Sequence, residues 1–428
     1  MFSINLVILA IGASLVIAVL AYLVLSKYEG SSINILTPSF VMAIPAYYLL
    51  PLVYLNLFGA EGSTYAHFWV YSALAVEPLA FVYAYTRTGD RVVRLPGASS
   101  YSNFGLVSLL CLGLGVLLYA PVLLQFREFI FDPRQIYTQT RTGFGFQAFV
   151  SSTLAYLAVI LILFSKRSKT FKVSAVLLAT GLLSLHGSKG QVLSVVSILL
   201  LYYVYVLGRK VTLARSMVVY LCMGMVVLLL FAATMSLGED AADALEAISK
   251  YSDYTRNAML VIDSHYPLQY GRLTIESNTL GIVPRQLMPG KPKNFGPFAL
   301  AEEFYPEWFD SDTGSPAFGV GLQYADFGSW AIGYLALVAA LRGWLARIFV
   351  NRLAFTKHPA DFLMLVFLAD ISIFPTGVGW LLPEALLAAV FLRWVSRIGA
   401  RKVYRERPQG MVMAQPQMLR QADRGSSA

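Results

Sequence analysis

Long apolar runs alternate with short polar connections along most of this chain. A run of about 20 apolar residues forms a helix long enough to cross roughly 30 Å of hydrocarbon, at about 1.5 Å per residue. The runs therefore predict an all-α fold, a polytopic bundle of about eleven transmembrane helices. They fall at residues 3–25, 36–58, 66–86, 103–124, 144–164, 171–185, 191–207, 216–236, 327–349, 360–375 and 378–396.

One long polar segment, residues 237–325, interrupts this pattern between the eighth and ninth predicted spans. It holds twelve of the chain's 24 acidic residues and seven of its 19 prolines. A polar insert of this length in a membrane protein predicts a loop domain that carries function. The chain then divides into a bundle at 1–236, the loop domain at 237–325, a second bundle at 326–397 and a disordered basic tail at 398–428.

The basic residues indicate how the chain is oriented. Composition is that of a membrane protein, with 57% hydrophobic and 13% charged residues, and the net charge of +9 is concentrated in alternate connections. Cytoplasmic connections are the ones enriched in Lys and Arg, so the N-terminus and the insert are predicted outside and the tail inside. The charge therefore reflects topology, and no soluble basic domain for nucleic acid is present. The basic residues of these connections are Lys27, Arg87, Arg91, Arg94, Lys166, Arg167, Lys169, Lys172, Arg209, Lys210, Arg215, Arg347, Arg352 and Lys357.

The fourth connection, FREFIFDPRQIYTQTRTGFG, carries three arginines on the side where arginine is disfavoured. One interpretation is structural, with Arg127 and Arg134 paired to neighbouring carboxylates for about 0–1 kcal/mol each. The other is functional, because the planar guanidinium group binds phosphate oxygens bidentately and would suit a phosphate-headed lipid. Arg141 has no acidic neighbour in this loop, which favours the second interpretation.

The outward connections resemble those of the Wzy-type polymerases of O-antigen and exopolysaccharide synthesis. In that family two outside loops each carry Arg, ten residues, then Gly; here Arg134 is followed by QIYTQTRTGF and Gly145, and Arg285 by QLMPGKPKNF and Gly296. The stretch LGIVPRQLMPGKPKNFG is similar to the Ile-Pro-Arg to Lys-Pro part of the family's large loop. The turn at 187–190 is similar to its Gly-Ser-Arg-Gly turn, with lysine in place of arginine.

The resemblance implies a bacterial inner-membrane enzyme with an arrangement similar to GT-C-type glycosyltransferases. Its active site would face the periplasm, where a growing glycan passes from undecaprenyl diphosphate to the next lipid-linked oligosaccharide repeat unit. The leaving diphosphate needs cations to absorb its developing charge. The implied partners are this lipid-linked oligosaccharide, the bilayer, and a chain-length regulator and a flippase of the same pathway.

Site residues are predicted from these requirements. The expected catalytic residues are Arg134, Arg285 and His265, the last as general base because a histidine's ordinary pKa of about 6.5 suits that role. Asp263 and Glu276 are the competing bases. The expected diphosphate-binding residues are Arg127, Arg141, Lys189, Arg256 and Arg272.

No cofactor or metal is expected. Cys111 and Cys222 lie inside apolar spans, and an Asp-x-Asp triplet at 310–312 is common in acidic loops. Arginines would do the work of a metal at the diphosphate.

Two further patterns occur in the insert. A helical period runs through 245–262 with Arg256 at its edge, which predicts an amphipathic helix that aims this arginine at the bundle. The aromatic residues of the insert have two interpretations: they stack on sugar rings, or they anchor the loop at the membrane interface. They are Phe295, Phe298, Phe304, Tyr305, Trp308 and Phe309.

Two alternative functions remain open, an oligosaccharide ligase of similar build and a secondary transporter or flippase. The transporter interpretation is based on Glu77, Asp370 and Glu384, carboxylates inside predicted spans and next to or near prolines. Against it, the chain shows no two-fold internal repeat, and a transporter has little use for so large an outer insert.

Overall fold

The computed structural model describes residues 2–89, 101, 103–130, 135–136, 144–187, 189–212, 214, 249, 252–280, 283, 287–310, 316–369 and 386–397. Within these residues the chain is helical, and β-pairing is limited to an isolated bridge between Tyr101 and Ser165. Six helices are long and apolar enough to cross a membrane. The predicted all-helical, membrane-embedded class is therefore confirmed. The predicted span at 216–236 lies outside the described residues.

The first 87 residues form three long helical segments. These are α1 (Phe2–Glu29), then α2 (Thr37–Ala43), η1 (Ile44–Leu49) and α3 (Leu50–Phe58) in succession, then α4 (Thr64–Arg87). The π-helical turn η1 contains Pro45, and prolines remove a backbone donor and disturb the regular ladder. Residues 37–58 nevertheless form one apolar stretch long enough to span.

A second group packs beside the first and consists mainly of α5 (Phe104–Gln125), α7 (Gly145–Leu163) and α8 (Lys169–Leu185). The short turn η2 (Arg127–Phe129) follows α5, and α9 (Lys189–Leu201) with η3 (Tyr202–Val206) follows α8. Small residues let α5 and α7 approach closely, since the Ser151 hydroxyl donates to the Gly115 carbonyl at 2.9 Å.

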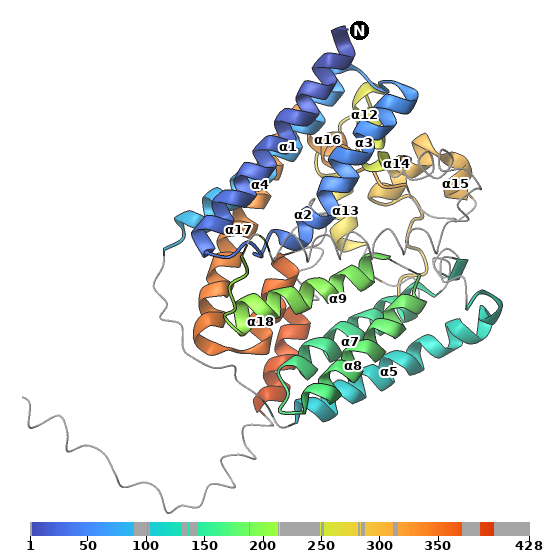
Figure 1. Cartoon of the computed structure of the whole chain (residues 1–428). Coiled ribbons are helices and arrows are strands. Elements are labelled where there is room, and N and C mark those ends of the chain that lie inside the picture. The colour runs from blue at the N-terminus through green and yellow to red at the C-terminus, as the bar shows by residue number, and fades with distance from the viewer. Residues whose placement is uncertain are drawn as a thin grey trace, which may run out of the picture.

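The insert folds into short helices around its own apolar core. These helices are α12 (Asp253–Asp263), α13 (Arg272–Thr279), α14 (Pro297–Phe304), α15 (Pro306–Asp310) and α16 (Gly321–Phe327). Val261, Leu273, Leu300 and Phe318 are buried together at its centre. Figure 1 shows these helices beside the end of the bundle where the chain begins.

The second bundle continues directly from the insert. The turn η5 (Gly328–Trp330) joins α16 to α17 (Ala331–Thr356), which packs along α4, and α4 in turn packs along α1. Gly343 makes the α17–α4 contact possible, because a Cβ there would lie 2.2 Å from the Phe81 carbonyl oxygen. After α17 come α18 (Pro359–Leu368) and a helix at 386–397.

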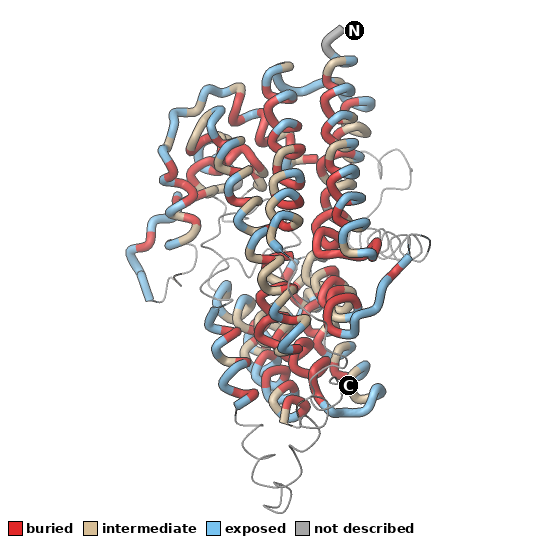
Figure 2. Tube along the Cα trace, turned by 90° about the vertical axis from the view of Figure 1, so that its left-hand side faces the viewer, coloured by how far each residue is buried: buried red, intermediate tan, exposed pale blue. Residues whose placement is uncertain are grey.

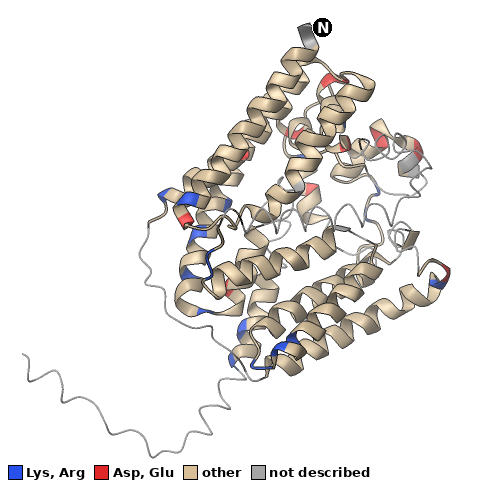
Figure 3. Ribbon diagram, viewed as in Figure 1, with Lys and Arg blue, Asp and Glu red and all other residues tan. Residues whose placement is uncertain are grey.

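Burial and charge follow the membrane pattern. Helices carry buried residues on one side and exposed apolar residues on the other (Figure 2), as in α5, where Leu106, Leu110 and Leu117 are each more than half exposed. Such residues are suited to lipid contact. Lys and Arg gather at the ends of α1, α4 and α17 that lie away from the N-terminus (Figure 3).

Candidate functional site

The short connection between α3 and α4 binds the insert to the bundle. Ser63 begins α4, where its hydroxyl accepts from the Ala66 amide at 3.1 Å, so it caps the helix. Asp263, at the end of α12, accepts from the Ser63 amide at 2.6 Å and from the Ser63 hydroxyl at 2.5 Å. Gly62 makes the approach possible, because a Cβ there would lie 3.1 Å from the Met259 Cβ. Asp263 therefore fixes the insert to the start of α4.

Arg256 of α12 lies among acidic and aromatic side chains rather than alone. Its Nε is 2.7 Å from Glu61 Oε2, and its Nη1 is 3.4 Å from Asp253 Oδ1. Its guanidinium carbon lies over the Tyr54 ring, 4.0 Å from the centroid, and the Tyr54 hydroxyl donates to Glu61. The predicted helix with an arginine directed at the bundle is thus confirmed for residues 253–263.

The local electrostatics follow from this packing. Burial raises the pKa of Glu61, but hydrogen bonds from Arg256 and Tyr54 outweigh it and hold the pKa below its ordinary value. Burial raises the pKa of Asp253 above its ordinary value, and the negative charge of Glu61 adds to this effect. One guanidinium therefore faces two carboxyl groups.

A pocket opens beside this cluster, between α12 and the ends of α1, α3 and α4. We call it the Arg256 pocket; it encloses about 310 Å³, part of it open to solvent. Seven of the thirteen side chains that line it are polar, so it differs from the lipid-facing surfaces around it. Its lining consists of Val7, Ile11, Pro51, Tyr54, Leu55, Gly59, Glu61, His67, Tyr71, Ser252, Thr255, Arg256 and Met259.

His265, the predicted base, lies in the turn directly after α12. Its backbone has a φ of 55°, unusual for a residue with a side chain, and the imidazole is exposed. Nδ1 lies 2.8 Å from the Asp263 carbonyl oxygen, which only accepts, so Nδ1 carries the proton. The Nε2 lone pair is then left to accept a proton.

The competing bases have structural partners. Asp263 holds Ser63, and Glu276 accepts from the Gly296 amide at 2.9 Å through one oxygen while the other lies 3.7 Å from Arg272 Nε. Arg272 begins α13 and is half-exposed, and Arg127 is exposed in η2 after α5. Figure 1 shows that end of α5 well away from α12, so Arg127 and Arg256 are not brought together.

Several predicted residues fall outside what the structure describes. These are Arg134, Arg141, Arg285 and the side chain of Lys189, whose backbone begins α9. The side chains of the Asp-x-Asp triplet fall there too, although the backbone of its first residue ends α15. Among the described residues no group of three His, Cys, Asp or Glu side chains could hold a metal ion.

The aromatic residues of the insert mainly build its core. Phe304 packs against Tyr266 and Phe318, and Tyr305 donates to Asn257 at 2.7 Å. Sequence reasoning missed Glu61 and Tyr54 as partners of Arg256. The available signal was that Glu61 is the only charged residue in an otherwise uncharged connection, 59–63.

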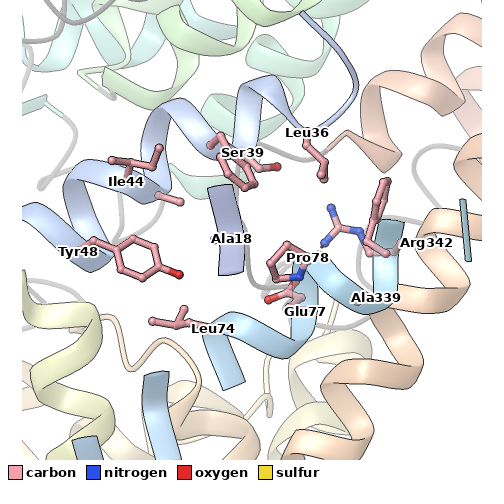
Figure 4. A pocket seen from close by; sticks show the side chains of 13 residues that line it. Ala18, Leu36, Ser39, Ile44, Tyr48, Leu74, Glu77, Pro78, Ala339 and Arg342 are labelled. Carbon is pink, nitrogen blue, oxygen red and sulfur yellow. Dashed lines mark ion pairs between the residues drawn. The ribbon is translucent and has the colours of Figure 1, made fainter. Parts of the chain in front are cut away.

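A second polar group lies deep inside the bundle, between α4 and α17. Glu77 Oε1 is 3.5 Å from Arg342 Nη1, and both side chains are nearly buried. Arg342 Nη2 also donates to the Leu368 carbonyl at 3.2 Å, so the cation caps the end of α18. Figure 4 shows the pair at the wall of a pocket of about 500 Å³. We call this the Glu77 pocket; it is lined by Ala18, Leu36, Ser39, Phe40, Ala43, Ile44, Tyr48, Leu74, Glu77, Pro78, Phe81, Ala339 and Arg342.

This pairing bears on the transporter alternative. Glu77 pairs with the guanidinium of Arg342, which also caps the end of α18. These two contacts join α4, α17 and α18. Asp370 and Glu384 lie outside the described residues. The described part of the chain therefore gives Glu77 a structural partner rather than an ion path.

Comparison with known proteins identifies the family. The chain is 33% identical over 386 residues to the O-antigen polymerase of Salmonella typhimurium, covering 90% of this chain and 94% of that protein. The O-antigen polymerase of Salmonella typhi matches with the same identity and coverage. No family model and no solved structure matches. Identity at this level over nearly the whole of both chains shows common descent, so this chain belongs to the Wzy-type O-antigen polymerase family.

Proposed function

We propose that this protein polymerises O-antigen by transferring a growing glycan from undecaprenyl diphosphate to the next lipid-linked repeat unit. The observation that carries the proposal is the relationship to two O-antigen polymerases over 90% of the chain. An alignment of that length includes most of the membrane helices and part of the insert, which are the two regions that the reaction needs. The lipid tails require a bilayer, and the sugars require a polar surface at its edge.

In the proposed reaction the acceptor hydroxyl oxygen attacks the anomeric carbon of the donor glycan. The bond from that carbon to the diphosphate oxygen breaks, and undecaprenyl diphosphate leaves with the electron pair. The acceptor's proton passes to His265 Nε2, which becomes protonated. Its hydrogen bond to the Asp263 carbonyl supports this role, because it leaves Nε2 as the accepting nitrogen.

The leaving diphosphate carries most of the charge that develops. We assign its binding chiefly to Arg134 and Arg285, with Arg127, Arg141, Lys189 and Arg272 as further cations at the same membrane face. Arg256 contributes less in this scheme, because Glu61 and Asp253 already balance its charge.

The reaction is proposed to occur at the periplasmic face. The gathering of Lys and Arg at the ends of α1, α4 and α17 that lie away from the N-terminus supports this orientation (Figure 3). Single cysteines at the exposed Glu303 and at Arg405, in a chain lacking Cys111 and Cys222, test it. A membrane-impermeant thiol reagent should label position 303 in intact spheroplasts and position 405 only after lysis. The opposite pattern would rule out an active site at the periplasmic face.

The function itself is tested with purified protein in lipid nanodiscs. Given undecaprenyl-diphosphate-linked repeat units, it should form a ladder of longer lipid-linked glycans on a gel and release undecaprenyl diphosphate. The matched control is the Arg134→Ala, Arg285→Ala double variant in the same nanodiscs. Transfer to a lipid A core acceptor in place of a ladder would identify a ligase, and absence of any transfer would contradict the proposal.

A further inference from the structure

The Arg256 pocket has a hydrogen-bonding character that a diphosphate site would not need. Arg256 offers donors, since a guanidinium carries five N–H groups and its described ion pairs use Nε and Nη1. Glu61 offers acceptor sites beyond those taken by Arg256 and Tyr54. Diphosphate oxygens only accept, so in this pocket they would meet the Glu61 carboxylate, which cannot donate to them.

His67 adds a further acceptor at the pocket wall. Its Nδ1 lies 2.9 Å from the Ser63 carbonyl oxygen, so Nδ1 is the protonated nitrogen and Nε2 accepts. The side chain is 5% exposed and lines the pocket. The polar groups of the lining therefore include both donors and acceptors.

Ser252 provides the second, independent observation. The residue lines the pocket and is 0% exposed, and its Oγ has no hydrogen-bond partner among the described residues. Leaving a buried hydroxyl without a partner costs free energy, and such groups usually mark a bound water or ligand. A hydroxyl both donates and accepts, which matches another hydroxyl.

We propose that the Arg256 pocket binds one sugar ring of the lipid-linked repeat unit, through Ser252, Glu61, Arg256 and His67. Sugar hydroxyls donate and accept at once and carry no charge, so they fit a lining of mixed donors and acceptors with one guanidinium and one carboxylate. The opening to solvent lets the rest of the glycan continue outward.

This inference deepens the proposed function and rests on it, because it places a sugar of the polymerase's substrate beside the insert. The location agrees with that role. The pocket lies where α12 of the insert meets the ends of three membrane helices, the place where the first sugars beyond a membrane-anchored diphosphate would emerge. Arg256 then donates to the sugar and also holds Glu61 toward it.

The test measures binding of a lipid-free repeat-unit oligosaccharide, released from its lipid by mild acid, to wild type and variants in nanodiscs. Ser252→Ala should weaken binding about three- to tenfold, as expected for one lost hydrogen bond. It should not lower the thermal midpoint, since the hydroxyl has no described partner to lose. Glu61→Gln should weaken binding tenfold or more, because hydrogen bonds to a charged group are stronger. Ser264→Ala and Glu303→Gln are the matched controls, and both should bind as wild type does.

A second probe, inorganic pyrophosphate, separates the sugar site from the diphosphate site. Inhibition by pyrophosphate should be equal in wild type and in the two pocket variants. In turnover assays with lipid-linked substrate, Ser252→Ala should raise KM and leave kcat unchanged. Unchanged oligosaccharide binding in both variants, absence of binding to wild type, or weaker pyrophosphate inhibition would each overturn the proposal.

The same experiment keeps the two proposals apart. Wild-type protein that makes polymer while Ser252→Ala and Glu61→Gln bind oligosaccharide normally would refute the sugar site alone. Wild-type protein that binds oligosaccharide through this pocket but forms no polymer would refute the proposed function alone.

Discussion

Two arginine–glutamate pairs join α4, or the connection that precedes it, to later parts of the chain. The two pairs differ in how far their side chains are exposed to water. Arg256 and Glu61 meet at 2.7 Å with side chains 28% and 49% exposed, whereas Arg342 and Glu77 meet at 3.5 Å with side chains 11% and 5% exposed. Water screens the first pair, so its ions can exchange partners at little cost. The second pair lies among apolar helices, where a lone charge is costly, so it fixes the bundle.

The difference indicates that the Arg256 pair serves ligand binding and that the Arg342 pair serves the stability of the helix bundle. The Arg256 pair borders a polar pocket open to solvent, while the Arg342 pair caps a helix end inside the bundle. Substitutions near the insert should therefore change activity with little change in protein level. Substitutions at the buried pair should change protein level first.

The largest expected effect comes from breaking the buried pair. Glu77→Leu or Arg342→Leu alone should lower the free energy of unfolding by about 3–5 kcal/mol, because the partner charge stays buried without compensation. Replacing both residues with leucine should recover most of that loss. Membrane protein level and the thermal midpoint in detergent measure this. Stable single variants, or a double variant no better than the singles, would contradict the structural role.

Next come the arginines assigned to the diphosphate. Arg134→Ala and Arg285→Ala should each lower turnover about 100- to 1,000-fold, the range for losing a preorganised charge partner of the transition state. Protein levels should stay near those of wild type. Arg→Lys should recover little, because an ammonium group lacks the bidentate fork. Full activity in both alanine variants would refute the assignment of these arginines to the diphosphate.

His265→Ala should lower turnover by about 100-fold at saturating lipid substrate, within the range for loss of a general base. Unchanged turnover in the variant would move the base to a carboxylate or remove the need for one.

The helix contact next to the buried pair gives a smaller effect. Gly343→Ala places a Cβ 2.2 Å from the Phe81 carbonyl oxygen, so it should force α17 from α4 and lower stability by about 1–3 kcal/mol. Gly333→Ala on the same helix is the control, since nothing lies within 4 Å of its Cβ position. Equal thermal midpoints for the two variants would show that α17 does not approach α4 this closely.

The smallest effect is expected at the exposed pair. Glu61→Gln should lower stability by at most about 1 kcal/mol at neutral pH. The pKa of Glu61 lies below its ordinary value, so its contribution is present above the ordinary carboxyl range and is lost as pH falls through the lowered value. The thermal midpoints of wild type and variant should therefore converge in acid. A difference that grows in acid would contradict the pairing with Arg256.

Hydrophobic periodicity by itself determined the class of this protein and most of its helices. Apolar runs long enough to span hydrocarbon leave few alternatives to a helix, because a backbone in lipid must satisfy its own hydrogen bonds. The stripe through Thr255, Met259 and Ile262 likewise predicted α12, whose buried side carries those residues.

The partners of each charge were decided only by the tertiary structure. Glu61 and Arg256 are 195 positions apart, and Glu77 and Arg342 are further apart still, so no local pattern relates them. Which ion pair is screened and which is buried depends on how α4 meets α12 at one end and α17 in its middle. Residue spacing along a helix specifies which side chains share a face, whereas the fold specifies which other element that face contacts. The burial of an ion pair then decides whether the pair serves binding or stability.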